Sequence, residues 1–219
     1  MPHSKASTAP SGMRARQDDA SAMPVPLRAM RAETLQRVEA AVLALFSSRD
    51  FNEVNLVDVA RSANVSLQTI YKYFGSKEAL VYTVLDLMLR RLAARMLDHL
   101  QGIDDVRERL RKTFWVMLDY VDREPAVIQL LGTALPVARH RNIQIYESPE
   151  LMNAFLGVLK DGQRRGELND KVSSKILLDV FMGILSRVVM MHLYRGEKTS
   201  LLHRFDELFE IVWRAMSAG

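Results

Sequence analysis

Six side chains with hydrogen-bond donors lie within ten positions of one another: Gln68, Thr69, Tyr71, Lys72, Tyr73 and Lys77. Amide and ammonium groups can reach base edges in a nucleic-acid groove, and hydroxyl groups can reach phosphate oxygens. At about 100° per residue, Gln68 and Lys72 share the outer face of a helix, and the hydroxyl residues flank them. The pattern predicts that Gln68 and Lys72 read bases and that the other four hold phosphates.

The opposite face of this helix is apolar. Leu67, Ile70 and Phe74 cluster there and are expected to point inward. A shorter helix comes before it, in which Val59 and Ala63 sit four positions apart and share an inward face. The two helices are therefore expected to pack together through these residues.

Capping and turn residues mark the ends of both helices. Asn55 is a good N-cap with Asp58 three positions on, which is close to a capping box. Asn64 falls where the chain must turn, and asparagine tolerates the left-handed conformation. Ser66 can cap the second helix. Residues 55–77 thus fit the helix-turn-helix plan for DNA binding.

An amphipathic helix over residues 28–48 is expected to cover the inner faces of this pair. Its apolar positions recur at helical spacing, and two phenylalanines help to close the small core: Leu35, Val38, Val42, Leu45, Phe46 and Phe51. Residues 28–77 are therefore predicted to form a three-helix DNA-binding domain. Residues 1–27 lack apolar periodicity, are no signal peptide, and are predicted to be a disordered arm.

Across residues 31–82 the chain resembles the TetR family of bacterial transcriptional regulators. The matching positions are Phe46, Phe51, Val59, Ala60, Ala63, Val65, Ser66, Thr69, Tyr71, Tyr73, Phe74, Ser76, Lys77, Glu78 and Leu80. The chain departs from the pattern at Asp50 and Asn64, where the family usually has glycine, and at Asn55, which replaces a threonine cap. The resemblance implies an all-helical homodimer with a C-terminal ligand-binding domain.

Helical patterns continue to the end of the chain. The helix over 76–101 is long enough to connect the first domain to the second, which spans residues 78–219. Further helices are predicted over residues 104–122, 126–135, 149–165, from Asp170 or Ser173 to Tyr194, and over 200–216. Pro136 is expected to end the helix over residues 126–135 and to be followed by an irregular stretch to residue 149. The fold class is therefore all-α, with a second domain for ligand binding and dimerisation.

The stretch 176–194 is apolar on nearly every side. Its length suits a membrane span, but Asp179 and Arg187 argue against one. A helix buried by its own domain on one side and by a partner subunit on the other fits better. Paired with the last helix across a two-fold axis, it would form a four-helix interface. The alternative is that both helices fill the core of one monomer.

Methionine and aromatic residues are frequent in the second domain, which suits an adaptable apolar pocket between helices. The candidate ligand-binding residues are Trp115, Leu118, Phe155, Met182 and Arg187. Arg187 is a cation in an apolar helix, so it either pairs with Asp179 or Glu150 or binds the anionic end of a ligand. A plain hydrophobic core is the alternative for most of these positions.

Signatures of enzymes are absent from the sequence: it has no glycine-rich phosphate loop, no His-Glu-x-x-His and no Gly-x-Ser-x-Gly. No catalytic residue, cofactor or metal site is therefore predicted. The chain has no cysteine, which suits a reducing cytoplasm, and its net charge of +4 is mild. The predicted function is a ligand-responsive repressor that leaves a palindromic DNA operator when it binds a small, largely apolar molecule. A helical ligand-binding or interaction protein that no longer binds DNA is the main alternative, and an enzyme on a helical bundle is a third.

Overall fold

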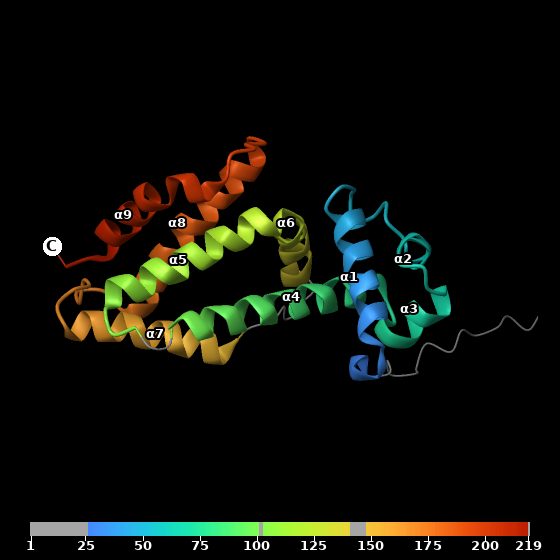
Figure 1. Cartoon of the computed structure of the whole chain (residues 1–219), viewed down its shortest axis with the longest axis horizontal. Helices are drawn as coiled ribbons and strands as arrows, with labels where there is room; N and C mark the ends of the chain where they lie inside the picture. Colours follow the sequence, from blue (N-terminus) through green and yellow to red (C-terminus); the bar gives the residue numbers. More distant parts are fainter. Residues whose placement is uncertain (1–25, 101–102, 141–147, 219) are drawn as a thin grey trace, which may run out of the picture.

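The computed structural model describes residues 26–100, 103–140 and 148–218, with the side chains of 133 and 135–140 left out. This part of the chain is helical, and its one pairing of extended residues is an isolated bridge between Leu168 and Ser217. The prediction of an all-α class is confirmed. Figure 1 shows two groups of helices joined by the long helix α4, Lys77–Leu100.

The smaller group, here called the head, consists of a 3-10 turn and three helices: Leu27–Ala29, α1 Ala32–Phe46, α2 Leu56–Ser62 and α3 Leu67–Phe74. The arm predicted over residues 1–27 lies outside the described residues apart from its last two. Leu27 belongs to the 3-10 turn and packs against the core of the head. Burial of its apolar side chain lowers the free energy of the folded state.

Local hydrogen bonds define the helix ends in the head as the sequence predicts. The Asn55 side chain accepts from the Asp58 amide at 3.0 Å, and Asp58 accepts from the Asn55 amide at 3.2 Å, which completes a capping box. Asn64 has φ of 52° in the turn, and Ser66 accepts from the Thr69 amide at the start of α3. These bonds satisfy amide groups that a helix leaves free at its first turn.

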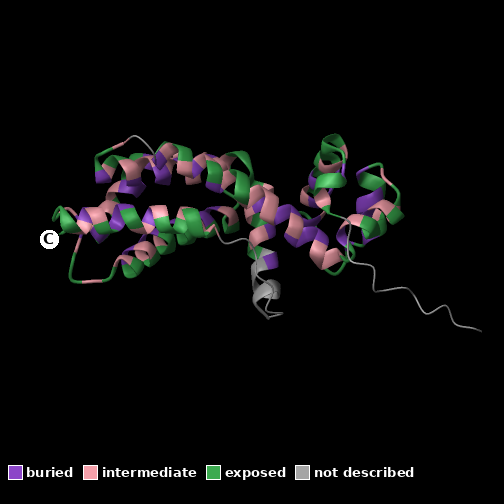
Figure 2. Ribbon diagram, turned by 90° about the horizontal axis from the view of Figure 1, so that it is seen from below, coloured by how far each residue is buried: buried purple, intermediate pink, exposed green. Residues whose placement is uncertain are grey.

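The core of the head joins all three helices to the first half of α4. Ile70 and Phe74 of α3 are buried, and Leu67 packs at the edge of the same cluster. Figure 2 shows that the buried residues of the head and those of the second domain form groups along the inner sides of their helices. Because the inner face of α3 is used in this way, its opposite face is left to solvent.

The described residues of the second domain form five α-helices and one 3-10 turn: α5 Val106–Arg123, α6 Pro125–His140, α7 Pro149–Arg164, α8 Ser174–Tyr194, the turn Leu201–Arg204 and α9 Phe205–Met216. Its core centres on Phe114, whose ring centroid lies 5.7 Å from that of Phe181 and 6.0 Å from that of Phe209. Aromatic pairs at such distances prefer tilted or edge-on arrangements. Three separate helices are thereby fixed around one ring.

The predicted stop at Pro136 is wrong, because α6 continues through this residue to His140. A proline inside a helix removes one backbone donor, and such helices persist when packing compensates. The described part of α6 supplies this packing, since Val127, Leu130 and Ala134 are buried in the same cluster as the core of the head. This helix of the second domain therefore lies directly against the head.

Helix α8 is long and apolar enough to cross a membrane by length and composition alone, with 21 residues and a mean hydropathy of 1.8. Only 28% of its apolar window is buried in the single chain. One side packs on the domain through Leu177, Phe181 and Leu185, and the other side faces solvent. The subunit's own domain therefore buries one side of α8, as the sequence predicts.

Candidate nucleic-acid interface and ligand cavity

The exposed face of α3 carries Gln68, Tyr71 and Lys72. Tyr71 keeps 53% of its surface open to solvent, although it lies in the middle of a short helix. The Lys72 ammonium lies 5.3 Å from the centroid of the Tyr73 ring, over its face. This surface presents an amide, a hydroxyl and a cation side by side, which are the groups that contact bases and phosphates.

Two of the other predicted contact residues have partners within the head. The Thr69 and Ser66 hydroxyl groups are 2.8 Å apart, and the Tyr73 hydroxyl donates to the carbonyl oxygen of Ala29 at 3.2 Å. Both residues are half-buried. Their hydroxyl groups therefore help to position α3 and lie at the edge of its exposed face.

Lys77 points into the head. Its Nζ atom donates to the carbonyl oxygens of Phe51 at 2.8 Å and Val54 at 3.0 Å, and it lies 4.7 Å from the centroid of the Phe51 ring. The ammonium thus closes the loop before α2 onto the start of α4. Nothing in the spacing of the sequence indicates these partners, because they lie 23 and 26 positions away.

An apolar cavity of about 560 Å³ lies between α4, α5, α7 and α8. Phe155 and Met182, both predicted ligand contacts, line it together. The remaining lining residues are Leu89, Leu92, Ala93, Met96, Met117, Ser148, Pro149, Leu151, Met152, Asn153 and Leu178. Its size and its apolar walls are typical of sites for small organic ligands.

The other three predicted ligand residues lie elsewhere. Leu118 is fully buried in the core around Phe114. Trp115 lines a different, smaller depression and has the Lys112 ammonium 4.8 Å from its ring centroid. Arg187 is exposed on α8 and, among the described residues, forms no salt bridge with Asp179 or Glu150. Helical spacing alone could not separate the side of α5 that faces the cavity from the side that faces the core.

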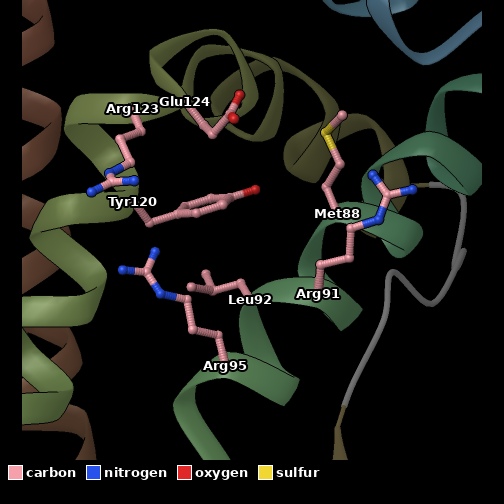
Figure 3. A pocket seen from close by; sticks show the side chains of 7 residues that line it. All are labelled: Met88, Arg91, Leu92, Arg95, Tyr120, Arg123 and Glu124. Carbon is pink, nitrogen blue, oxygen red and sulfur yellow. The ribbon is translucent and has the colours of Figure 1, made fainter. Parts of the chain in front are cut away.

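A second depression, here called the arginine hollow, has a volume of about 310 Å³ and lies between α4 and the end of α5. Its lining residues are Met88, Arg91, Leu92, Arg95, Tyr120, Arg123 and Glu124. Figure 3 shows Arg95, Tyr120 and Arg123 at one end and Met88 and Arg91 at the other. Arg95 of α4 and Arg123 of α5 meet at the same carboxylate, Asp119, so their approach depends on the packing of α4 on α5.

Buried carboxylates hold these arginines in place. Both oxygens of Glu39, on α1, accept from Arg91 at 2.8 Å. Asp119 accepts from Arg95 and from Nε of Arg123, the latter at 2.8 Å. Burial acts to raise the pKa of Asp119, but the hydrogen bonds from the two arginines outweigh it and the pKa is lowered. Asp119 is therefore a fixed anion beneath the hollow.

The Tyr120 side chain lines the same hollow, and its hydroxyl group is uncharged. Burial first, and the nearby Glu124 carboxylate second, raise the pKa of Tyr120 to about 12. The hydroxyl therefore keeps its proton over the whole neutral range and can donate a hydrogen bond. Within the described residues, no three histidine, aspartate or glutamate side chains come together as metal ligands. Nδ1 of His192 lies 3.3 Å from a carboxylate oxygen of Glu197.

The helix-turn-helix segment matches a known family of DNA-binding domains. Residues 39–83, which contain the helix-turn-helix, match the domain family described as bacterial regulatory proteins, tetR family. The transcriptional regulator UidR of Escherichia coli is 24% identical over 166 residues, which cover 71% of this chain and 81% of UidR. Residues 39–83 are therefore a TetR-family DNA-binding domain. The prediction of a helix-turn-helix transcriptional regulator is confirmed.

Solved structures share the fold of this chain over most of its length. FadR of Bacillus halodurans, a regulator of fatty acid degradation, has a TM-score of 0.70 at 14% identity and covers 84% of this chain and 96% of its own. FadR of Bacillus subtilis, crystallised with stearoyl-CoA, has a TM-score of 0.67 at 14% identity and covers 81% and 96%. At such low identity the likeness concerns the arrangement of the helices.

Proposed function

We propose that this TetR-family protein is a homodimeric repressor in the cytoplasm that leaves a palindromic DNA operator when a largely apolar ligand fills its cavity. The observation that supports this most is the position of the apolar cavity against α4. Leu89, Leu92 and Ala93 of α4 form part of its wall, and the same helix starts directly after α3. A ligand that moves α4 therefore moves the helix that faces DNA.

The exposed face of α3 supports a division of roles among its side chains. Gln68 and Lys72 read base edges, and Tyr71 contacts the phosphate backbone. Thr69 and Tyr73 add phosphate contacts from the edge of the surface while their hydroxyl groups hold α3 in place. Lys77 contributes indirectly, because its ammonium fixes the loop at Phe51 and Val54.

Exposed apolar residues support the proposed dimer. Ile176, Met190 and Tyr194 lie on the open side of α8, and Ile211 lies on the open side of α9. Gly183 lies along the same side of α8, and no atom approaches within 4 Å of where its Cβ would be. A second copy that covers these faces would form a four-helix interface and bring two α3 helices to one side of the DNA.

The ligand class follows from the cavity. Its walls are mainly Leu, Met and Phe, which suit a hydrocarbon chain or an aromatic ring. The B. subtilis relative was crystallised with stearoyl-CoA, a molecule with a long acyl chain. We infer that an amphipathic molecule with a hydrocarbon part of this kind occupies the cavity.

Selection of bound sequences from a random DNA pool is the experiment that tests DNA binding, and it is expected to yield an inverted repeat. Calorimetry of fatty acids and aromatic compounds, with and without that operator, then tests the switch. Linkage requires the operator to weaken ligand binding by the same factor by which the ligand weakens operator binding. Equal ligand affinity in both conditions would remove the switch for that compound. A chain that enriches no sequence would instead be a ligand-binding protein that no longer binds DNA.

A further inference from the structure

We propose that the arginine hollow binds the anionic end of the amphipathic ligand, and that this binding draws Arg91 away from Glu39 and loosens the head. The inference rests on the proposed function, because the apolar part of the ligand is taken to lie in the neighbouring cavity. It assigns a site and a charge requirement to residues whose role the cavity does not explain. The ligand class is an amphiphile that ends in a carboxylate or a phosphate.

The two sites adjoin along α4 and α5. Leu92 lines both the apolar cavity and the arginine hollow. On α5, Met117 faces the cavity and Tyr120, one turn further, faces the hollow. A chain that leaves the cavity past Leu92 therefore enters the hollow, where it meets polar groups.

The polar groups of the hollow are donors. Arg91, Arg95 and Arg123 each carry a guanidinium with five N–H groups, and the Tyr120 hydroxyl adds one more. Their contacts with carboxylates use only part of this capacity. Arg95 donates to Asp119 through one terminal nitrogen, and Arg123 donates to Asp119 through Nε. The side chains of Arg91 and Arg123 are 57% and 68% exposed, so their remaining N–H groups are open to a ligand. Guanidinium groups bind carboxylates and phosphates in pairs of parallel hydrogen bonds.

Three carboxylates oppose the charge of these arginines, and their positions decide what an anion must displace. Asp119 is buried beneath Arg95 and Arg123, where it orients both without filling the hollow. Glu124 is exposed at the rim and can turn to water. Glu39 is the remaining competitor, because it takes two hydrogen bonds from Arg91. An anion in the hollow therefore competes mainly with Glu39 for Arg91.

This competition reaches the head. Glu39 belongs to α1 and is 5% exposed, so the loss of Arg91 leaves a carboxylate in a buried position without this partner. Such a group is unfavourable until the structure shifts to hydrate it. The contact between α1 and α4 is thereby weakened when the anion binds. The ligand thus acts on the head through a charge as well as through the shape of the cavity.

Paired ligands test the charge requirement on the full-length protein. Sodium dodecanoate and dodecanol share a hydrocarbon chain and differ in the anionic end, and calorimetry measures the affinity of each. Dodecanoate is expected to bind about tenfold tighter or more, as for a gained charge-assisted hydrogen bond. Arg95→Met and Arg123→Met are each expected to remove the preference, while Arg90→Met, one position from Arg91 but outside the hollow, keeps it. Circular dichroism checks that each variant is folded, and the more exposed Arg123 serves if Arg95→Met is not.

Glu39→Gln tests the competition. Without the rival carboxylate, dodecanoate should bind several-fold tighter than to the wild type, while the affinity for dodecanol should not change. Equal affinity of dodecanoate for both proteins would overturn the link to Glu39. Sodium pyrophosphate, added alone, tests a free anion as the source: binding at micromolar concentration without a preference for dodecanoate over dodecanol would overturn the amphiphile. If both amphiphiles bind equally and release the operator, this inference fails and the proposed function stands; if neither binds, both fail.

Discussion

Glu39 of α1 and Arg91 of α4 are joined by two parallel hydrogen bonds of 2.8 Å across 52 positions of sequence. The pair ties the first helix of the head to the helix that carries the ligand cavity. Its carboxylate is buried and its guanidinium faces solvent. The bond to Glu39 raises the pKa of the Arg91 guanidinium, in spite of partial burial that acts in the opposite direction.

A double-mutant cycle with Glu39→Gln and Arg91→Met should give a coupling of about 1 kcal/mol, since the pair is bidentate but open to water on one side. Urea unfolding measures the four free energies. The pair Asp86 and Arg90 is the matched control, because it lies within α4 and neither of its side chains is buried. Its coupling is expected to stay near 0.3–0.5 kcal/mol, roughly the range for exposed helix pairs. Equal couplings would contradict a special role for Glu39.

Lys72→Ala should relax the base preference at one position in each half of the operator, at a cost of roughly 1–3 kcal/mol. The reason is that Lys72 lies on the exposed face of α3 beside Gln68. Fluorescence anisotropy on the selected operator and its single-base variants measures the change. Lys160→Ala, an exposed lysine on α7, should leave binding unchanged. A uniform loss across all DNA sequences would make Lys72 a phosphate contact.

Lys77→Met should destabilise the head by about 2 kcal/mol, because Nζ donates two hydrogen bonds to backbone carbonyl oxygens. The dependence of DNA binding on salt should change little, since the ammonium points into the head. Thermal unfolding and salt titrations separate the two effects. Lys72→Met is the matched control and should leave stability nearly unchanged. A salt slope lowered by about one in Lys77→Met, with unchanged stability, would restore its role as a phosphate contact.

Protonation of Asp119 should lower the free energy of unfolding in acid. Because its pKa is lower in the folded than in the unfolded state, the unfolded chain binds more protons as pH falls. The stabilisation is therefore present above the ordinary aspartate pKa of about 4 and is lost as pH falls through the lowered value. Urea unfolding from pH 7 to pH 3 should show a smaller decrease in Asp119→Asn than in the wild type. Parallel curves for the two proteins would contradict this account.

Ile211→Asp should produce folded monomers. Ile211 is 52% exposed on α9, so a carboxylate there disturbs the proposed interface and leaves the core of the subunit intact. Sedimentation velocity at micromolar concentration measures the mass, and circular dichroism measures the fold. Val57→Asp, at a similarly exposed apolar residue on α2, should remain a dimer. A wild-type chain that sediments as a monomer would count against the whole arrangement.

The local pattern of the sequence was enough to predict the helix-turn-helix. Caps at Asn55 and Ser66, the turn at Asn64 and the apolar face of Ile70 and Phe74 all act within a few residues, so spacing alone reveals them. The exposed positions of Gln68 and Lys72 follow from the same periodicity. The boundaries of the longer helices were predicted well for this reason, except at Pro136, where packing of α6 on the head overrides a local signal.

Tertiary structure alone decided which groups share a site. The partners of Lys77 are carbonyl oxygens in a distant loop, and carbonyl groups carry no signature in the sequence. The rotation of α5 about its axis places Leu118 in the core and Met117 in the wall of the cavity. Arg187 lies on the exposed side of α8, outside both the core and the cavity. The arginine hollow exists only because α4 crosses α5 where Arg95 and Arg123 reach one buried carboxylate. Periodicity fixes the face of a helix on which a residue lies, but the neighbour that this face meets depends on how the helices pack.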